Sequence, residues 1–315
     1  MKIKNFLLMA VLGLSMTFTS CDDILGEWSR PVVNTNTGST PKQGALTGKF
    51  TINAEGKQVY FSQGNLQATY NGSSWIWAFA EHQYDYIGNA TANNAVNGSM
   101  AVSAIGTVDL FGWNGGNSTH YGINNSTTDS DYGNSTSDVL NDWGNLAISN
   151  GGNVANSGWR TLTKDEWTYI FMTRTSGSTV NSIENARYTK AVINTDGTAV
   201  QGVILFPDGV TIENSEATLW GPFNASSDYG DQCKCTTAQW TALEAKGCVF
   251  LPAAGGRTGS TVTGDGSAAR YWSSTPNGTS ASDAYFLHFG TSYLSPSGNG
   301  QRKVAVSVRL VCQVE

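Results

Sequence analysis

The sequence has little charge, few histidines and no long apolar run. Charged residues make up 13% of the 315 positions, about half the share usual in a soluble domain, and there are 3 histidines. The 24 acidic residues outnumber the 18 basic ones, and no cluster of Lys and Arg follows the first few residues. This balance argues against a nucleic-acid partner. Because no 18 consecutive residues are apolar, we expect no membrane-spanning helix.

Glycine and aromatic residues are abundant instead. The chain contains 36 Gly, 10 Trp, 12 Tyr and 12 Phe, and so many aromatic side chains argue against a disordered protein. A helical bundle is excluded because its helices would be filled with Glu, Lys, Ala and Leu. Short alternating runs between turn residues predict an α+β fold, with short, mainly antiparallel strands, two helices, long loops and no parallel-sheet pattern.

The N-terminus has the features of an export signal. Lys2 and Lys4 precede an unbroken apolar run of 9 residues, 6–14, which is too short to span a bilayer and typical of a secretory signal. Cys21 comes next, followed by two aspartates. The arrangement resembles a bacterial lipoprotein signal, in which a peptidase cuts before a cysteine that is then lipidated. The aspartates are similar to the surface-export signal of Bacteroides-type bacteria. An ordinary signal peptide with a chance cysteine is the alternative.

These features predict three segments. Residues 1–20 are the signal peptide, and residues 21–45 are a lipidated N-terminus with a flexible tether that contains two prolines and several Thr, Asn and Ser. Residues 46–315 form one folded domain. We expect the protein to be held on the outer membrane by its lipid and to face the outside of the cell.

Four cysteines remain once Cys21 is set aside, and an even number in an exported chain favours disulfides. Cys235 and Cys248 flank a predicted helix, so we predict a disulfide between them. Cys233 and Cys312 would then form the second pair. Free thiols, or a metal at Cys233 and Cys235, are the alternatives that the spacing leaves open.

Two hairpins and two helices are the clearest elements. Residues 49–53 pair with 58–61, and residues 188–194 pair with 200–206, each across a turn with glycine. Thr163 and Glu166 predict a capping box that opens a helix ending near residue 174. Thr236 or Thr237 caps a second helix over 238–246, which Gly247 ends. Further strands are predicted over 66–70, 75–79, 84–87, 248–252, 271–274, 284–289 and 304–311.

Three segments together resemble a known family. WRTLTKDEW over residues 159–167 resembles the helix opening of the formylglycine-generating-enzyme type of C-type-lectin fold. GCVFLPAAG over 247–255 and an ending with YWSS at 271–274, AY at 284–285 and SVRLV at 307–311 resemble the Fibrobacter succinogenes major paralogous domain. That family is widespread in Bacteroides surface lipoproteins and includes variable proteins of diversity-generating retroelements.

The resemblance implies a C-type-lectin-like fold in which a fixed framework displays an alterable binding face. The residue types near the C-terminus divide in the same way, with small polar residues, isolated aromatics and a lysine forming the predicted ligand-binding face. Its predicted members are Asn277, Ser280, Ser282, Asp283, Phe286, His288, Thr291, Tyr293, Ser297, Asn299, Gln301 and Lys303. The predicted core consists of Tyr271, Trp272, Tyr285, Phe289, Val306, Val308 and Leu310, with Arg309 as a buried or half-buried cation.

No enzymatic motif accompanies this face. The oxidase of the fold uses two copper-binding cysteines near its C-terminal signature, whereas residues 271–310 contain none. The histidines, His82, His120 and His288, accompany no nucleophile motif. We therefore expect no enzyme and no resident cofactor. Calcium stays an alternative because C-type-lectin relatives often bind it, and the residues that suit it by composition are Asn141, Asp142, Asp129 and Asp131.

The sequence thus predicts a surface-anchored lipoprotein that binds an external protein or glycan, and it leaves open whether a retroelement diversifies the chain. A structural or pilus-associated adhesin subunit is the alternative, and an envelope enzyme has no motif to support it.

Overall fold

Strands dominate the computed structural model of this chain. It describes residues 41–88, 106–116, 121–195, 197–213 and 225–315, together with the backbone of 96–97, 101–102 and 218–219. Strand accounts for 43% and helix for 12% of the structure. The predicted α+β class with its C-type-lectin-like fold is therefore wrong, and the fold is β-rich. The helices are short, and the Ser-, Gly- and Asn-containing residues Tyr293–Gln301, for which no strand is predicted, form a strand.

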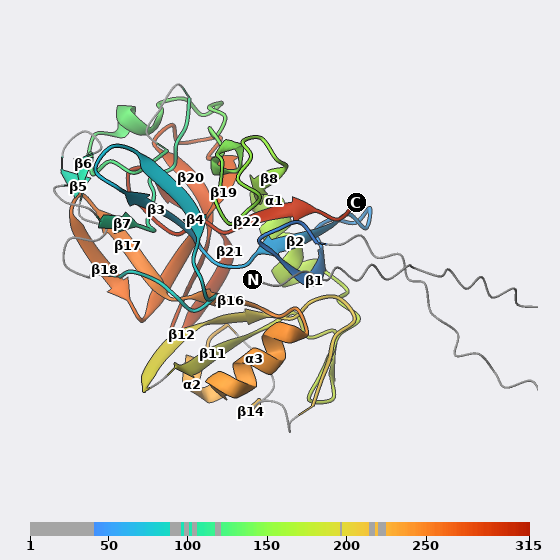
Figure 1. Ribbon diagram of the computed structural model, residues 1–315. Coiled ribbons are helices and arrows are strands. Elements are labelled where there is room, and N and C mark those ends of the chain that lie inside the picture. Colours follow the sequence, from blue (N-terminus) through green and yellow to red (C-terminus); the bar gives the residue numbers. More distant parts are fainter. Residues whose placement is uncertain are drawn as a thin grey trace, which may run out of the picture. The chain divides into compact units, whose positions relative to one another are not determined.

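One four-stranded antiparallel sheet joins the start of the described chain to its end, in the order β1-β2-β22-β8. The predicted first hairpin is confirmed as β1 and β2, with Phe50 opposite Val59. In Figure 1, β2 lies beside β22 near the C-terminus. The strands are β1 (Ala45–Thr51), β2 (Gln58–Ser62), β22 (Leu310–Gln313) and β8 (Trp159–Thr161).

A second sheet, of five strands in the order β14-β15-β11-β12-β16, lies in the lower part of Figure 1. The predicted second hairpin is confirmed as β11 and β12. β11 and β15 run parallel, as do β9 and β13 elsewhere, so the expectation of no parallel pairing is wrong. The strands are β14 (Thr218–Leu219), β15 (Cys233–Thr236), β11 (Tyr188–Thr195), β12 (Thr198–Leu205) and β16 (Val249–Pro252).

The third large sheet has the order β18-β17-β19-β20-β21 and carries most of the predicted ligand-binding face. Alternate residues of β19 pack into different cores, because successive strand side chains point to opposite faces. Trp272 belongs to a core cluster with Phe286 and Val306, whereas Tyr271 belongs to a cluster with Phe289. The strands are β18 (Thr261–Asp265), β17 (Ala254–Thr258), β19 (Ala268–Pro276), β20 (Asp283–Gly290) and β21 (Tyr293–Gln301).

Smaller sheets complete the β structure. Strands β3 and β4 confirm two sequence predictions, whereas residues 84–87 are not a strand. Of the predicted strand 304–311, residues 305–307 make isolated bridges and only residues 310–311 belong to a strand. The sheets have the orders β4-β3-β7, β10-β9-β13 and β5-β6. Their strands are β4 (Trp75–Phe79), β3 (Leu66–Tyr70), β7 (Gly106–Val108), β10 (Ile183–Glu184), β9 (Thr179–Val180), β13 (Thr211–Ile212), β5 (Val96–Asn97) and β6 (Ala101–Val102).

The helices are short and well capped. Both capping boxes are present, from Thr163 with Glu166 and from Thr236 with Gln239, and Gly247 ends the last helix with a φ of 85°. Trp240 of α3 packs on Phe250 of β16, with ring centres 5.5 Å apart. The helices are α1 (Lys164–Thr168), α2 (Tyr229–Gln232), α3 (Thr237–Ala245), the π-helix η3 (Tyr169–Thr173) and the 3-10 turns η1 (Asp129–Tyr132) and η2 (Trp143–Asn145).

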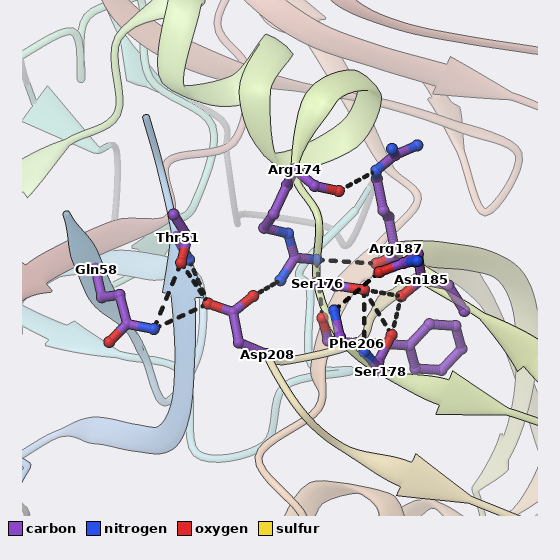
Figure 2. A network of polar contacts seen from close by, with 11 residues as sticks. Thr51, Gln58, Arg174, Ser176, Ser178, Asn185, Arg187, Phe206 and Asp208 are labelled. Carbon is purple, nitrogen blue, oxygen red and sulfur yellow. Dashed lines mark hydrogen bonds and ion pairs between the residues drawn. The ribbon is translucent and has the colours of Figure 1, made fainter. Parts of the chain in front are cut away.

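A buried ion pair connects the first hairpin to η3 (Figure 2). Arg174, whose side chain is fully buried, donates to the Asp208 carboxylate over 2.6 Å. The other oxygen of Asp208 accepts from Gln58 and from the backbone N–H and the hydroxyl of Thr51. Burial lowers the pKa of Arg174 although Asp208 opposes the shift. The carboxylate therefore holds together three segments that are distant in the sequence.

The predicted disulfide between Cys235 and Cys248 is not formed in this structure, where these two residues, Cys233 and Cys312 are buried thiols. Cys233 and Cys235 stand two residues apart on β15, so both side chains point to the same face. Their sulfur atoms lie 3.4 Å apart.

Several sequence predictions fall outside the described residues. These are the signal peptide 1–20, the lipidation site Cys21, the tether up to residue 40, and His120. Among the described residues, no helix is long and apolar enough to cross a membrane.

Candidate ligand-binding site

The motif residues of the C-terminal ending form a hydrogen-bonded framework around Trp272. The Trp272 indole donates to the Phe111 carbonyl over 2.7 Å, and the Trp113 indole donates to the Ser273 carbonyl over 2.9 Å. From α1, the Trp167 indole donates to the carbonyl of Trp272. Because each buried indole has an acceptor, the framework leaves these polar groups satisfied. Trp272 is 1% exposed, which confirms its place in the core.

Arg309 is the buried cation that the sequence predicts. Its guanidinium donates to Gln83 over 2.6 Å, and burial lowers its pKa to about 10. The hydroxyl of Tyr271 donates to the Pro252 carbonyl over 2.9 Å, so the YWSS motif is linked to the FLP motif. The predicted core members Phe289, Val306, Val308 and Leu310 are fully buried.

Tyr285 is the predicted core residue that lies elsewhere. It is half-buried on β20, and the Lys164 ammonium lies 4.9 Å from its ring centre. Its neighbours Ala284 and Phe286 are buried. Tyr285 therefore lies on the opposite side of β20 from Ala284 and Phe286, where it contacts Lys164 and is only partly buried.

Arg270 of β19 lies at the centre of the candidate site, although it is not among the residues predicted from the sequence. Its guanidinium carbon lies 5.4 Å from the centre of the Phe286 ring, a cation–π geometry. Its Nε is buried and has no hydrogen-bond partner. In the described part of the chain, every other arginine donates a hydrogen bond from its guanidinium, namely Arg160, Arg174, Arg187, Arg257, Arg302 and Arg309.

Two small hollows meet at Arg270. One has a volume of about 100 Å³ and is lined by Arg270, His288, Tyr293 and the glycines of β17 and β18. The other, of about 160 Å³, is lined by Arg270, Phe286, Asn299, Gln301 and apolar residues that include Trp272. The guanidinium is thus shared by two adjoining depressions on one sheet.

A row of aromatic rings leads from the core to the surface beside Arg270. Trp272 and Phe286 have ring centres 5.6 Å apart, Phe286 and His288 5.7 Å, and His288 and Tyr293 4.5 Å. The row passes from Phe286, 6% exposed, to Tyr293, 39% exposed. It therefore ends in an exposed ring that a ligand can contact.

The electrostatics of this row keep His288 neutral. Burial lowers the pKa of His288 to about 4, and the Arg270 charge adds to the shift. The imidazole Nε2 and the Tyr293 hydroxyl are 2.8 Å apart and share a hydrogen bond. At neutral pH, Arg270 is therefore the charged group of the two hollows.

The structure brings together five of the twelve predicted binding residues, which are Phe286, His288, Tyr293, Asn299 and Gln301. It adds Arg270 and the glycines of β17. A signal for Arg270 exists in the sequence, because it directly precedes the YWSS motif and is the single charged residue of β19. Reading it would have required the register of β19 against β20, in which Arg270 lies opposite His288.

Asn277 and Lys303 line neither hollow, although the Asn277 amide donates to the Asn299 side chain over 3.4 Å. Asn277 is 6% exposed, and its side-chain oxygen accepts from the backbone and hydroxyl of Thr279. Lys303 forms an ion pair with Asp129 over 3.1 Å. Both side chains therefore have contacts within the protein, and the prediction that they bind a ligand stays a prediction.

The remaining five predicted residues lie outside both hollows. The carbonyl of Thr291 accepts from the buried Lys190 ammonium, and Ser297 is exposed on β21. Ser280, Ser282 and Asp283 bond to one another at the start of β20. The two hollows therefore contain only part of the predicted set.

The residues considered for calcium have other contacts. Both oxygens of Asp142 accept from the backbone of Thr161, and one also accepts from Gly144, while burial raises its pKa. Asp131 accepts from the Ser126 hydroxyl, and Asp129 pairs with Lys303. Within the described ranges, no three His, Cys, Asp or Glu side chains are grouped to hold a metal ion.

A larger hollow of about 530 Å³ lies on another part of the surface. It is lined by residues 84–88, Thr195, Thr198, Val200 and Asp265. It contains no predicted binding residue and no arginine or lysine. The hollows at Arg270 therefore remain the candidate site, since they combine an unpartnered cation with the predicted residues.

Comparison with known proteins returns no match, whether with family models, with curated sequences or with solved structures. The resemblance in the three sequence segments therefore stays a prediction.

Proposed function

We propose that this chain is a ligand-binding protein, held at the outer membrane through a lipid on Cys21, that binds an external protein or glycan with β19–β21. One observation carries the proposal, namely that two adjoining hollows meet at Arg270 and contain five residues that the sequence predicts for ligand binding. Binding sites combine an apolar or aromatic surface with a few placed polar groups. Phe286 and Tyr293 supply the first here, and Arg270, Asn299 and Gln301 supply the second.

The rigidity of the support also favours binding. Phe286 and Arg270 lie on paired strands of a five-stranded sheet, and the indole hydrogen bonds of Trp113 and Trp272 fix that sheet to other segments. A site built on strands loses little conformational entropy when a ligand binds. The exposed amides on β21 can adjust to a partner while the framework stays fixed.

The test is an array of glycans and proteins probed with the purified full-length chain. We expect at least one ligand whose binding weakens when Asn299 or Gln301 is replaced with Ala. Ser297→Ala is the matched control, because Ser297 is exposed on the same strand but lies outside both hollows. Hits that bind all variants equally, or an array without hits, contradict the proposal.

A further inference from the structure

No carboxylate of the described residues forms an ion pair with Arg270. The buried or half-buried arginines at 160, 174 and 302 pair with Glu166, Asp208 and Asp138 over 2.6 to 2.7 Å. Arg270 forms no ion pair with a carboxylate of the described residues, and its Nε is buried without an acceptor. A partly buried charge without a partner is costly. An anion that enters from outside would remove that cost.

The surroundings of the guanidinium leave room for such an anion. Gly256 stands beside it, and a Cβ added there would lie 3.7 Å from the Arg270 Nη1, so the missing side chain keeps this edge open. Phe286 covers one face of the guanidinium. Arg270 lines both hollows, and a guanidinium can donate from two N–H groups at once to two oxygens of an oxyanion.

The other groups of the hollows fit a sugar better than a peptide. Asn299 and Gln301 are exposed and offer amide donors and acceptors that match hydroxyl groups, and Tyr293 offers an exposed ring face. Volumes of about 100 and 160 Å³ are below the about 300 Å³ at which pockets for larger ligands begin. Each hollow therefore suits one ring or one substituent.

We infer that the ligand is an acidic saccharide, and that Arg270 binds its carboxylate or its sulfate ester. The inference rests on the proposed function and specifies its substrate class. Arg270 is then the residue that distinguishes acidic from neutral sugars, and Asn299 and Gln301 bind the hydroxyl groups of either kind.

Saturation-transfer NMR with the full-length chain tests the inference. The carboxylate probe is methyl glucuronide and its neutral partner is methyl glucoside, whereas glucose 6-sulfate is compared with glucose. We expect each acidic probe to bind more tightly than its neutral partner. The acid–neutral pair with the larger difference in affinity shows whether the site prefers a carboxylate or a sulfate ester. Arg270→Gln should weaken acidic binding about tenfold or more, because hydrogen bonds between charged groups are lost.

Two further variants show whether a loss of binding comes from the Arg270 guanidinium or from the lower net charge of the protein. Arg270→Lys keeps the charge but not the paired donors, so we expect intermediate binding. Lys57→Gln removes the same charge from an exposed turn and should leave binding unchanged. Equal binding by Arg270→Gln and wild type overturns the inference, provided the melting temperature shows that the variant is folded. If Arg270→Gln unfolds, Arg270→Lys and the comparison of acidic with neutral probes decide.

The remaining outcomes separate the inference from the proposed function. If neutral and acidic probes bind equally and Gln301→Ala weakens both, the binding site stands and the acidic class is wrong. If N-acetylglutamate amide binds and no acidic sugar does, the ligand is an acidic peptide and the saccharide class is wrong. If no probe binds, the inference fails, whereas the array decides the proposed function.

Discussion

The guanidinium of Arg270 lies over the ring of Phe286, and that ring in turn lies on the glycines of β21. A Cβ added at Gly298 would come within 2.8 Å of the Phe286 ring, and one added at Gly300 within 3.1 Å. Phe286 therefore belongs at once to the core and to the support of the candidate site. Its neighbours explain why the SPSGNGQ segment contains glycine at these two positions.

The first prediction concerns this packing. Gly298→Ala should lower the free energy of unfolding by about 1 to 3 kcal/mol, because the new methyl group would push the Phe286 ring or the strand aside. Urea denaturation measures the change. Gly278→Ala is the matched control, since no atom lies within 4 Å of its added Cβ, and it should change stability by less than about 0.5 kcal/mol. Equal stability of both variants would show that Phe286 is not packed on β21.

The second prediction concerns His288, whose pKa is lowered to about 4 by burial and by Arg270. In the unfolded chain a histidine has a pKa of about 6.5, so as the pH falls from 6.5 to 4 the unfolded chain takes up the proton first. The folded protein should therefore lose stability over this interval. Because His288 is partly exposed, we expect a loss of about 1 to 2 kcal/mol rather than the full value of the shift.

Urea denaturation at pH 7 and pH 4.5 checks this result, with His288→Gln and His82→Gln beside wild type. The acid-dependent loss should be smaller in His288→Gln and unchanged in His82→Gln, because His82 is exposed. NMR titration of the histidine rings gives a direct measurement. A His288 that titrates near 6.5 contradicts the prediction.

The local elements could be read from the sequence wherever short-range signals specify them. Thr163 with Glu166 and Gly247 marked helix ends that the structure confirms, because capping depends on residues three or four apart. The two hairpins were equally local. Large side chains such as Trp272 were assigned to the core correctly because they are too apolar to remain outside.

The fold class, and which residues come together at the candidate site, depend instead on pairing between strands that the sequence does not specify locally. β21 contains Ser, Gly, Asn and Pro, which have little intrinsic tendency to form a strand. The segment is a strand because it pairs with β20. Arg270 lies beside the other residues of the site only because β19 pairs with β20. Asn277 lines neither hollow, and its side-chain oxygen accepts from the backbone of a turn. Composition cannot distinguish a polar residue that binds a ligand from one that bonds to its own backbone.

The third prediction concerns the ion pair in Figure 2. Asp208→Asn should lower the free energy of unfolding by about 3 kcal/mol, because it leaves the fully buried Arg174 without its counter-ion. Thermal and urea unfolding measure the loss. Asp165→Asn is the control, since Asp165 is 88% exposed in its pair with Lys164, and it should have little effect. Similar losses of stability in both variants would mean that burial does not increase the contribution of the Arg174–Asp208 ion pair to stability.

The fourth prediction concerns Cys21, which should be lipidated if the N-terminus is a lipoprotein signal. Cells fed a clickable fatty acid should label the wild-type chain and leave Cys21→Ala unlabelled. Cys312→Ala serves as the control, because Cys312 is buried in the folded chain and should not affect labelling. Equal labelling of wild type and Cys21→Ala contradicts the proposed anchor.

The last prediction concerns the four buried thiols. Cys233, Cys235 and Cys248 are fully buried and Cys312 is 4% exposed, so a thiol reagent should modify none of them in the folded protein. Thiolates are the reactive form, and burial raises the pKa of Cys312 to about 11, while the contact with Cys235 and burial raise that of Cys233. After unfolding without a reductant, all four should react, and mass spectrometry of the labelled peptides counts them. If the Cys235 and Cys248 peptides stay linked and unlabelled until a reductant is added, the two residues form a disulfide and the prediction is wrong. If Cys233 and Cys235 are linked instead, their neighbouring sulfur atoms have been oxidised to a disulfide.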